Sequence, residues 1–527
     1  MAAQTFDSRM ERRRILLCWF VPLLLYLSNL DGTWIQDDHY HVEQNPYIRS
    51  AKHIPRILTT TVWQSTSEET TRSDIYRPVL MMSWMADQFL FGLRPWGFHL
   101  INNVFHAVNC VLLYALLRTF LGSSSSLLGG LLFAVHPLGV EAVSWIGGRQ
   151  DLLLALLALC NIHALLKWLK SPSPIWIGLY ALTLPLGLFS KESFVLVPIA
   201  GIAALLISSG DRRETAARLK SPCAVLIGVF IGCFLWRNEI VRRSFFELLS
   251  PELFGNALAL AKRFLLLLFV PADSDFLFPY RARSFAWMSA ALPFALITAL
   301  IASLMFAIRK NTAAVLGILF LLAPLVPAAL VLDLVGTIAE RYFYLPMVGI
   351  ALLFAASIEG LEKRVSVPRL GAWIGCLLLV LSLVTVARNR EWRDEETLYR
   401  SSIQRDPSNE APYFLLAWHY HRSGSFSQEI EAYRDGLQRN PRHFSMLNNL
   451  AVRLTERGEF VEAKELLKRA YGLYPRVARV SYNVGYFYER TGEVKNARKW
   501  YGQAIQLDPT YEIPKIALRR LGTSSTP

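Results

Sequence analysis

The sequence predicts an all-α protein in two parts: a polytopic bundle of about eleven membrane-spanning helices, followed by an α-solenoid of short helical repeats. Hydrophobic residues make up 53% of the 527 residues, and apolar stretches approaching the roughly 20 residues that cross a bilayer recur along the first part of the chain. The C-terminal part is polar and periodic instead. We therefore expect a membrane domain over 1–390 and an extracytoplasmic repeat domain over 391–527.

The membrane domain begins with an expected uncleaved signal anchor. A basic cluster at 12–14 precedes the first apolar stretch, 15–30, and no small-residue cleavage pattern follows that stretch. A polar first loop, 31–95, comes next. Eleven further apolar windows then follow, at about 97–119, 127–145, 150–169, 175–190, 193–209, 221–236, 257–271, 287–308, 312–332, 343–358 and 370–387.

The basic loops predict which windows cross the membrane, because Lys and Arg concentrate in short cytoplasmic loops. If all twelve windows cross, the basic loops at 309–310 and 363–369 fall outside the cytosol. If the short window 257–271 does not cross, every basic loop is cytoplasmic. We therefore expect that window to be re-entrant or to lie at the membrane interface, which leaves eleven spans and places the C-terminus outside the cytosol.

Charge and cysteine content exclude several other classes. The formal net charge is +14, but much of the basic excess lies in short loops between apolar windows, so no nucleic-acid partner is expected. The six cysteines all lie in apolar stretches and form no CxxC pair, which argues against disulfides and zinc.

The C-terminal part repeats every 34 residues. A helix–turn–helix unit of this length, closed by a proline and containing small residues where helices pack, is typical of the tetratricopeptide repeat. Residues 394–405 resemble the second helix of a half repeat before the array. The repeats are expected at about 410–443, 444–477 and 478–511, with prolines at 407, 441, 475 and 509.

The first loop carries an acidic pair, Asp37 and Asp38, a few residues beyond the first span. An Asp pair in that place can simply form a turn that ends a helix. Alternatively, one carboxylate is a general base that takes a proton from an acceptor hydroxyl while its neighbour orients the site. The two carboxylates could also bind a divalent cation, so the metal requirement stays open.

Further acids and bases lie at the outer junctions between apolar windows, where charge is costly and usually functional. Each of them alone is typical of a salt bridge, but together they would suit a lipid-linked phosphate, which needs Arg and Lys to hold it and to stabilise it as it leaves. The five-residue step from His136 to Glu141 does not match the HExxH zinc motif. The candidates for phosphate contact are Arg77, Arg149, Lys191 and Arg341, and the candidate supporting residues are His136, Glu141, Asp151, Glu192, Glu340 and Tyr342.

A series of motifs follows in a fixed order from about Gln36 to the end of the chain. They are DD, YRPV, GFHLINNVFHAVN, FAVHPLGVEAVSWIGGRQDLL, SKES, ERYFYLPMVG and RNREWRDEETLYR, followed by tetratricopeptide repeats. In these motifs and their order, the chain resembles the TMTC-type protein O-mannosyltransferases and their bacterial relatives. The most specific blocks are HPxxxEAVxWxxGRxD and ERYxYLP. This family commonly has an aromatic residue before the acidic pair, where Gln36 stands here.

The resemblance implies a GT-C-like glycosyltransferase that moves a sugar, mannose or another hexose, from a polyprenyl- or dolichyl-phosphate carrier to Ser or Thr hydroxyls of extracytoplasmic proteins, with inversion. It implies that Asp37 or Asp38 is the base and that Arg149, Lys191 and Arg341 contact the phosphate. The expected location is a bacterial inner membrane with a periplasmic site, with a lumenal site in the endoplasmic reticulum as the alternative. The alternatives to this activity are a lipid-linked oligosaccharide ligase or polymerase and a non-enzymatic tetratricopeptide scaffold.

Overall fold

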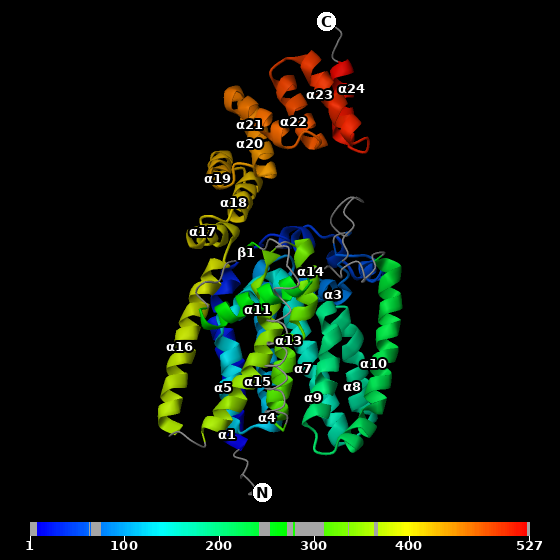
Figure 1. Cartoon of the computed structure of the whole chain (residues 1–527), viewed down its shortest axis with the longest axis vertical. Coiled ribbons are helices and arrows are strands. Elements are labelled where there is room, and N and C mark those ends of the chain that lie inside the picture. The colour runs from blue at the N-terminus through cyan, green and yellow to red at the C-terminus, as the bar shows by residue number, and fades with distance from the viewer. Residues whose placement is uncertain are drawn as a thin grey trace, which may run out of the picture. The chain divides into compact units, whose positions relative to one another are not determined.

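The computed structural model describes residues 8–62, 64, 75–241, 253–270, 278–279, 310–335, 337–362 and 367–523. The chain divides into two compact units, Met1–Asp394 and Glu395–Pro527. Each unit is built from helices (Figure 1). The predicted combination of a membrane helix bundle and a helical repeat array is confirmed.

The first unit is a bundle of apolar helices that run side by side in Figure 1. Within the described residues, seven helices are long and apolar enough to cross a membrane, or eight if one bent pair counts as a span. The chain is therefore a multi-pass membrane protein, but the predicted number of eleven spans is not confirmed, and the window 287–308 lies outside the described residues. The bundle contains α1 (Ser8–Leu25), α4 (Pro95–Phe120), α5 (Ser123–Val135), α7 (Arg149–Lys170), α8 (Pro174–Leu188), α9 (Leu196–Ser208), α10 (Arg212–Ile240), α13 (Thr312–Leu322), α14 (Leu325–Val335), α15 (Tyr344–Leu361) and α16 (Val367–Glu391).

The first loop folds into short helices with their own apolar core. Trp34, Val42 and Trp84 of this segment pack together with Phe98 of α4 and Ile146. This core fixes the loop against the bundle, so the side chains that the loop carries have defined positions. Its elements are η1 (Leu27–Asp31), η2 (His39–Glu43), η3 (Tyr47–Arg49), η4 (Ala51–His53), α2 (Ile54–Ile57) and α3 (Pro78–Phe91).

Helix α11 (Leu253–Phe269) corresponds to the window that we expected not to cross the membrane. In Figure 1 it lies across the neighbouring bundle helices rather than along them. Its Phe264 ring packs 5.1 Å from the ring of Phe343, measured between centroids, whereas its Leu265 and Phe269 side chains are exposed. This arrangement is typical of a helix that lies in the membrane interface with one apolar face toward lipid.

A two-stranded antiparallel ladder is the one departure from the all-α expectation among the described residues. It pairs β1 (Phe278–Pro279) with β2 (Thr337–Ile338). Two residues per strand are too few to produce the alternating pattern that identifies a strand in a sequence. The ladder leads directly into η11 (Glu340–Phe343), which carries several of the candidate site residues.

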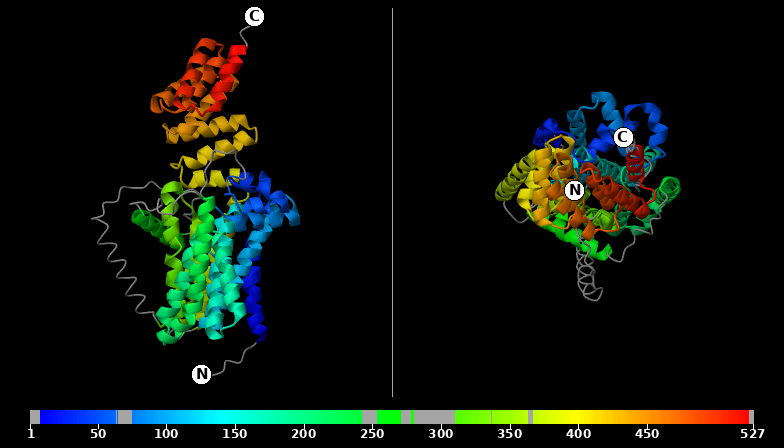
Figure 2. Two further views of the ribbon diagram at one scale, coloured as in Figure 1. Left: turned by 90° about the vertical axis from the view of Figure 1, so that its right-hand side faces the viewer. Right: turned by 90° about the horizontal axis from the view of Figure 1, so that it is seen from above.

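The second unit consists of helices stacked in successive antiparallel pairs (Figure 2). Gly424, Gly458 and Gly492 each adopt a positive φ, between 73° and 82°, at the turn between the helices of a pair. Glycine favours this left-handed conformation because it has no Cβ. The helices are α17 (Glu395–Arg405), α18 (Ala411–Arg422), α19 (Phe426–Arg439), α20 (Phe444–Arg457), α21 (Phe460–Leu473), α22 (Ala478–Arg490), α23 (Val494–Leu507) and α24 (Glu512–Thr523).

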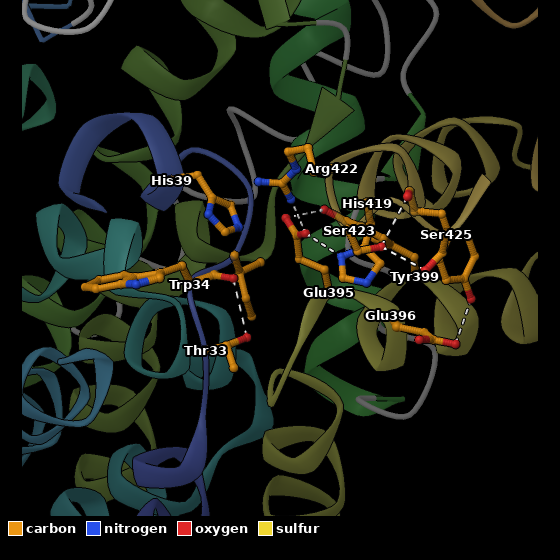
Figure 3. A network of polar contacts seen from close by, with 12 residues as sticks. Thr33, Trp34, His39, Glu395, Glu396, Tyr399, His419, Arg422, Ser423 and Ser425 are labelled. Carbon is orange, nitrogen blue, oxygen red and sulfur yellow. Dashed lines mark hydrogen bonds and ion pairs between the residues drawn. The ribbon is translucent and has the colours of Figure 1, made fainter. Parts of the chain in front are cut away.

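A buried carboxylate joins α17 to the first full repeat (Figure 3). Glu395 Oε2 lies 2.8 Å from His419 Nδ1 and also forms an ion pair with Arg422. The neighbouring Glu396 accepts a hydrogen bond of 2.7 Å from the Tyr420 hydroxyl. These contacts attach the half repeat to α18 and make α17 part of the array.

Candidate active site

Asp38 is the buried member of the acidic pair, and it holds the first loop in place. Its carboxylate accepts hydrogen bonds from the backbone N–H of Ile35, at 3.1 Å, and of Gly147, at 2.9 Å. Gly147 belongs to η7 (Ile146–Gly148), just before α7. Asp38 is only 1% exposed, so these bonds attach the loop to the bundle from inside the fold.

Asp37 is the more accessible member of the pair. Its side chain is partly exposed, and its carboxylate forms no hydrogen bond or ion pair with the residues that the structure describes. The preceding residue, Gln36, has a φ of +52°, a left-handed conformation that is uncommon outside glycine. This turn separates the two neighbouring carboxylates, so that one is occupied by backbone donors and the other remains available to a ligand.

Three predicted phosphate-binding side chains lie in one cluster of ion pairs. Arg77 precedes α3 and bonds to Glu192, at 2.9 Å, and to Gln150. Lys191 pairs with Asp151 of α7, and Arg341 pairs with Glu141 of α6 (Val140–Ser144). The structure therefore brings together six of the residues identified in the sequence, from five separate segments.

Two aromatic rings pack against this cluster, and one of them also contacts the first loop. The Tyr342 ring lies 5.3 Å from both Lys191 Nζ and Arg341 Cζ, within the range of cation–π attraction. The Trp145 ring lies 4.7 Å from Arg341 Cζ, and its Nε1–H donates a 3.1 Å hydrogen bond to the carbonyl of Ile35. Trp145 thus contacts both the cationic cluster and the turn that carries Asp37.

Burial and charges of both signs act on the pKa of Lys191. Burial lowers this pKa below its usual value, and the charges of Arg77 and Arg341 lower it further, whereas Asp151 raises it. Burial disfavours the charged ammonium, so the charge of Lys191 depends on Asp151 or on another anion in its place.

Arg149 does not join this cluster, in contrast to the expectation from its motif. Its side chain is 0% exposed and forms an ion pair with Asp87 of α3. Its other donors reach Asn102 Oδ1, at 2.7 Å, and the carbonyl of Phe98, at 2.9 Å. Protein acceptors already occupy this guanidinium, and through them it joins α3, α4 and α7.

Two supporting candidates also lie apart from the cluster. His136 is 2% exposed and its Nδ1 accepts a hydrogen bond of 3.2 Å from the backbone N–H of Leu138, at the break between α5 and α6. Glu340 is buried against Arg388 of α16, at 3.3 Å. Both positions stabilise junctions between helices.

Sequence reasoning missed Trp145, Asp87 and Gly147. Trp145 lies inside the most specific block but was not assigned a role, and Gly147 acts through a backbone N–H that any residue would supply. Asp87 could have been found, because a carboxylate inside the apolar segment PVLMMSWMADQFLF needs a buried cationic partner. Among the described residues, no group of three or more His, Cys, Asp or Glu side chains has an arrangement that could hold a metal ion.

Family models match a segment in each of the two parts of the chain. Residues 77–236 match the family model of the dolichyl-phosphate-mannose-protein mannosyltransferases, and residues 448–512 match a tetratricopeptide repeat model. A crystal structure of ArnT from Cupriavidus metallidurans bound to undecaprenyl phosphate is similar over 93% of this chain and 79% of that one, with 14% identity and a TM-score of 0.41.

Curated relatives are similar over most of the chain. The human protein O-mannosyl-transferase TMTC1 is 27% identical over 504 residues, covering 83% of this chain and 56% of that protein. The human TMTC3 is 24% identical over 557 residues, covering 95% of this chain and 56% of that protein. The chain thus spans about half the length of the curated relatives that it matches. The resemblance to the TMTC-type family is confirmed, and in this chain the membrane part that matches the mannosyltransferase model is followed by tetratricopeptide repeats.

Proposed function

We propose that this protein is a membrane glycosyltransferase that moves a hexose, with mannose as the first candidate, from a polyprenyl-phosphate carrier to Ser or Thr hydroxyls of extracytoplasmic proteins. The observation that carries the proposal is the contrast within the acidic pair. Asp37 is available, whereas Asp38 is occupied by two backbone N–H groups. A general base has to reach the proton that it removes, and only Asp37 meets that requirement.

In the proposed reaction, Asp37 removes the proton from the acceptor hydroxyl as its oxygen attacks the anomeric carbon of the sugar. The bond from that carbon to the phosphate oxygen breaks on the opposite face, so the configuration inverts. The lipid phosphate leaves with the electron pair of the broken bond. Arg77, Lys191 and Arg341 would stabilise the negative charge that develops on the phosphate, as preorganised cationic groups do in phosphoryl-leaving reactions.

Several other residues would hold the site in shape. We assign Asp38 to fixing the first loop and Trp145 to aligning that loop with Arg341. We reassign Arg149 from the phosphate to the buried pair with Asp87. Glu141, Asp151 and Glu192 would hold the three cationic side chains until the donor arrives.

We propose that the repeat array binds the acceptor protein, because tetratricopeptide solenoids offer a concave surface to extended segments. We place both the site and the array on the periplasmic side of a bacterial inner membrane, with the lumen of the endoplasmic reticulum as the alternative location. The alternative to acceptor binding is that the array binds a partner protein unrelated to catalysis.

Intact-mass analysis of extracytoplasmic proteins tests the proposed activity. The cells would express the wild-type protein, Asp37→Ala, or the matched control Asp31→Ala, which alters an exposed carboxylate in the same loop. We expect a hexose-sized mass on particular proteins with the wild type and with the control, and its loss with Asp37→Ala. With equal amounts of folded protein in the membrane, the hexose on the same proteins in all three samples would contradict the assignment of Asp37 as the base. Its absence from all three would contradict the proposed activity.

The configuration of the product tests inversion separately. The glycopeptides from the wild-type cells would be treated with an α-specific or a β-specific mannosidase. A β-linked lipid donor should give an α-linked product, which only the α-specific enzyme removes. Removal by the β-specific enzyme would instead show retention.

A further inference from the structure

His41 is a titratable residue of the first loop that the proposed reaction has not yet used. It follows Asp37 by four residues, and its backbone N–H donates a hydrogen bond of 2.7 Å to the Asp37 carbonyl. Residues four apart in a helical turn lie on the same side of it. The imidazole of His41 and the carboxylate of Asp37 therefore belong to one face of the turn.

The surroundings of His41 fix its ring and place it between two charged parts of the site. Its imidazole stacks on the indole of Trp84, a buried residue of α3, with the ring centroids 6.4 Å apart and the planes at 22°. The charged groups that act on the ring are Asp37, on its own turn, and Arg77, at the start of α3. Arg77 is in turn bonded to Glu192 at the edge of the cationic cluster.

We infer that His41 is a positioning residue that accepts from Asp37 the proton which Asp37 has taken from the acceptor. This inference rests on the proposed function. In the first step the hydroxyl proton moves to Asp37 while the sugar moves to the hydroxyl oxygen. In the second step the O–H bond of the Asp37 carboxylic acid breaks and an N–H bond forms on His41. The imidazolium then loses its proton to water, and both side chains return to their starting states.

The charge state of His41 suits this role. Burial lowers the pKa of His41 below 6.5, Asp37 raises it, and Arg77 lowers it again, with a net lowering. The imidazole is therefore neutral at neutral pH and has a nitrogen lone pair for the proton. Below its pKa the ring is already protonated and cannot accept another proton, so turnover should fall as the pH is lowered through that pKa.

The neighbouring His39 supplies a matched control. It lies on the same short helix, η2, but its Nδ1 is 2.6 Å from Glu43 Oε2, which is a separate contact within that helix. His39→Phe and His41→Phe thus make the same chemical change at two places on one turn. Phenylalanine at position 41 also keeps an aromatic ring that can stack on Trp84. The effect of losing the imidazole nitrogens is therefore measured without the effect of losing this packing.

The test measures sugar transfer by the full-length protein in proteoliposomes, with tritium-labelled polyprenyl-phosphate mannose as donor and a threonine-rich peptide as acceptor. General acid–base groups typically contribute a factor of about 10² to 10⁴, and a relay that acts after the first base should give the lower end of that range. We expect kcat to fall about 100-fold in His41→Phe with KM unchanged for both substrates. We also expect the acid limb of its pH profile to shift to lower pH, since the imidazole that becomes protonated in that limb is absent, whereas His39→Phe should match the wild type.

Each other outcome overturns a defined part of the reasoning. No transfer by the wild-type protein with this donor would count against the proposed function itself. Transfer by His41→Phe with wild-type kcat and pH profile would overturn only the inference about His41. Equal losses in both variants would show that the turn is merely structural. If His41→Phe does not elute as a monodisperse protein, His41→Gln replaces it, with the same expected loss of kcat and shift of the acid limb.

Discussion

Replacing each member of the acidic pair separately should produce opposite effects on stability and activity. Asp38→Ala removes a buried carboxylate that accepts two backbone hydrogen bonds, from Ile35 at 3.1 Å and from Gly147 at 2.9 Å. Hydrogen bonds to charged groups are worth roughly 1.5–3 kcal/mol each, and an unpaired buried donor adds a cost. The two bonds share one carboxylate and are not independent, so we expect a loss of about 3 kcal/mol in the free energy of unfolding.

Asp37→Ala removes a partly exposed carboxylate without a hydrogen-bonded partner among the described residues. Surface substitutions of this kind usually change stability by no more than about 0.5 kcal/mol. Loss of a general base, in contrast, should slow transfer by about 10²- to 10⁴-fold. We therefore expect Asp37→Ala to be a stable, inactive protein and Asp38→Ala to be a destabilised one.

Two measurements on the same purified samples separate these effects. Tryptophan fluorescence during heating gives the unfolding midpoint in nanodiscs, and labelled-mannose transfer gives the rate. Asp38→Asn is a useful intermediate, because its amide oxygen still accepts a hydrogen bond but carries no charge. Equal unfolding midpoints for Asp37→Ala and Asp38→Ala would refute the structural assignment of Asp38. Full activity in Asp37→Ala would refute the assignment of the base.

Four further substitutions test other parts of the structure. Arg149→Met should lower the free energy of unfolding by about 3–5 kcal/mol, because it leaves the buried carboxylate of Asp87 unpaired, and thermal unfolding followed by fluorescence measures this. A raised KM for the donor with an unchanged unfolding midpoint would instead favour a phosphate contact. Gly349→Leu should destabilise the bundle by about 1–3 kcal/mol or more, since even a Cβ at this glycine would lie 2.5 Å from a backbone oxygen of α13, and the melt of the purified variant checks it. Lys191→Arg should retain its affinity for the donor at higher pH than the wild type, because the wild-type lysine has a lowered pKa and loses its charge below the usual 10.5 as the pH rises. The KM for the donor, measured as a function of pH in both proteins, tests this. Glu192→Gln should lower the KM for the donor, because it removes the carboxylate that competes with the phosphate for Arg77.

The architecture could be predicted well because its signals are local and repeated. A membrane helix is recognised in a sequence by a continuous apolar stretch. Tetratricopeptide repeats are recognised by a pattern that recurs every 34 residues, here in three units. The distribution of basic loops and the short length of the window 257–271 predict that it does not cross the membrane, and this stays a prediction. The number of membrane-spanning helices was harder to predict. Several apolar helices, such as α8 and α9, lie within the bundle but are shorter than a helix that crosses a membrane along its full thickness.

The roles of individual charged residues could not be predicted, since a role depends on which distant side chain a residue meets. Asp37 and Asp38 are identical and adjacent in sequence, and only the turn at Gln36 and the donor from Gly147 distinguish them. Arg149 lies in the most specific sequence block, yet its partner, Asp87, is 62 positions earlier in the chain. A conspicuous motif can thus mark a residue that holds the fold as readily as one that meets the substrate.

The charge balance of the cationic cluster indicates how a lipid phosphate would bind there. Arg77, Lys191 and Arg341 each face a carboxylate, so the cluster carries no large net positive charge before the donor arrives. The phosphate must then exchange places with one of those carboxylates, and the exchange costs least where the displaced group can turn to water. In the pairs of Lys191 and Arg341 the carboxylate side chains are at most 2% exposed, whereas the Glu192 side chain is 38% exposed. Arg77 is therefore the cation that can change partners, and the two buried pairs keep the site formed while it does so.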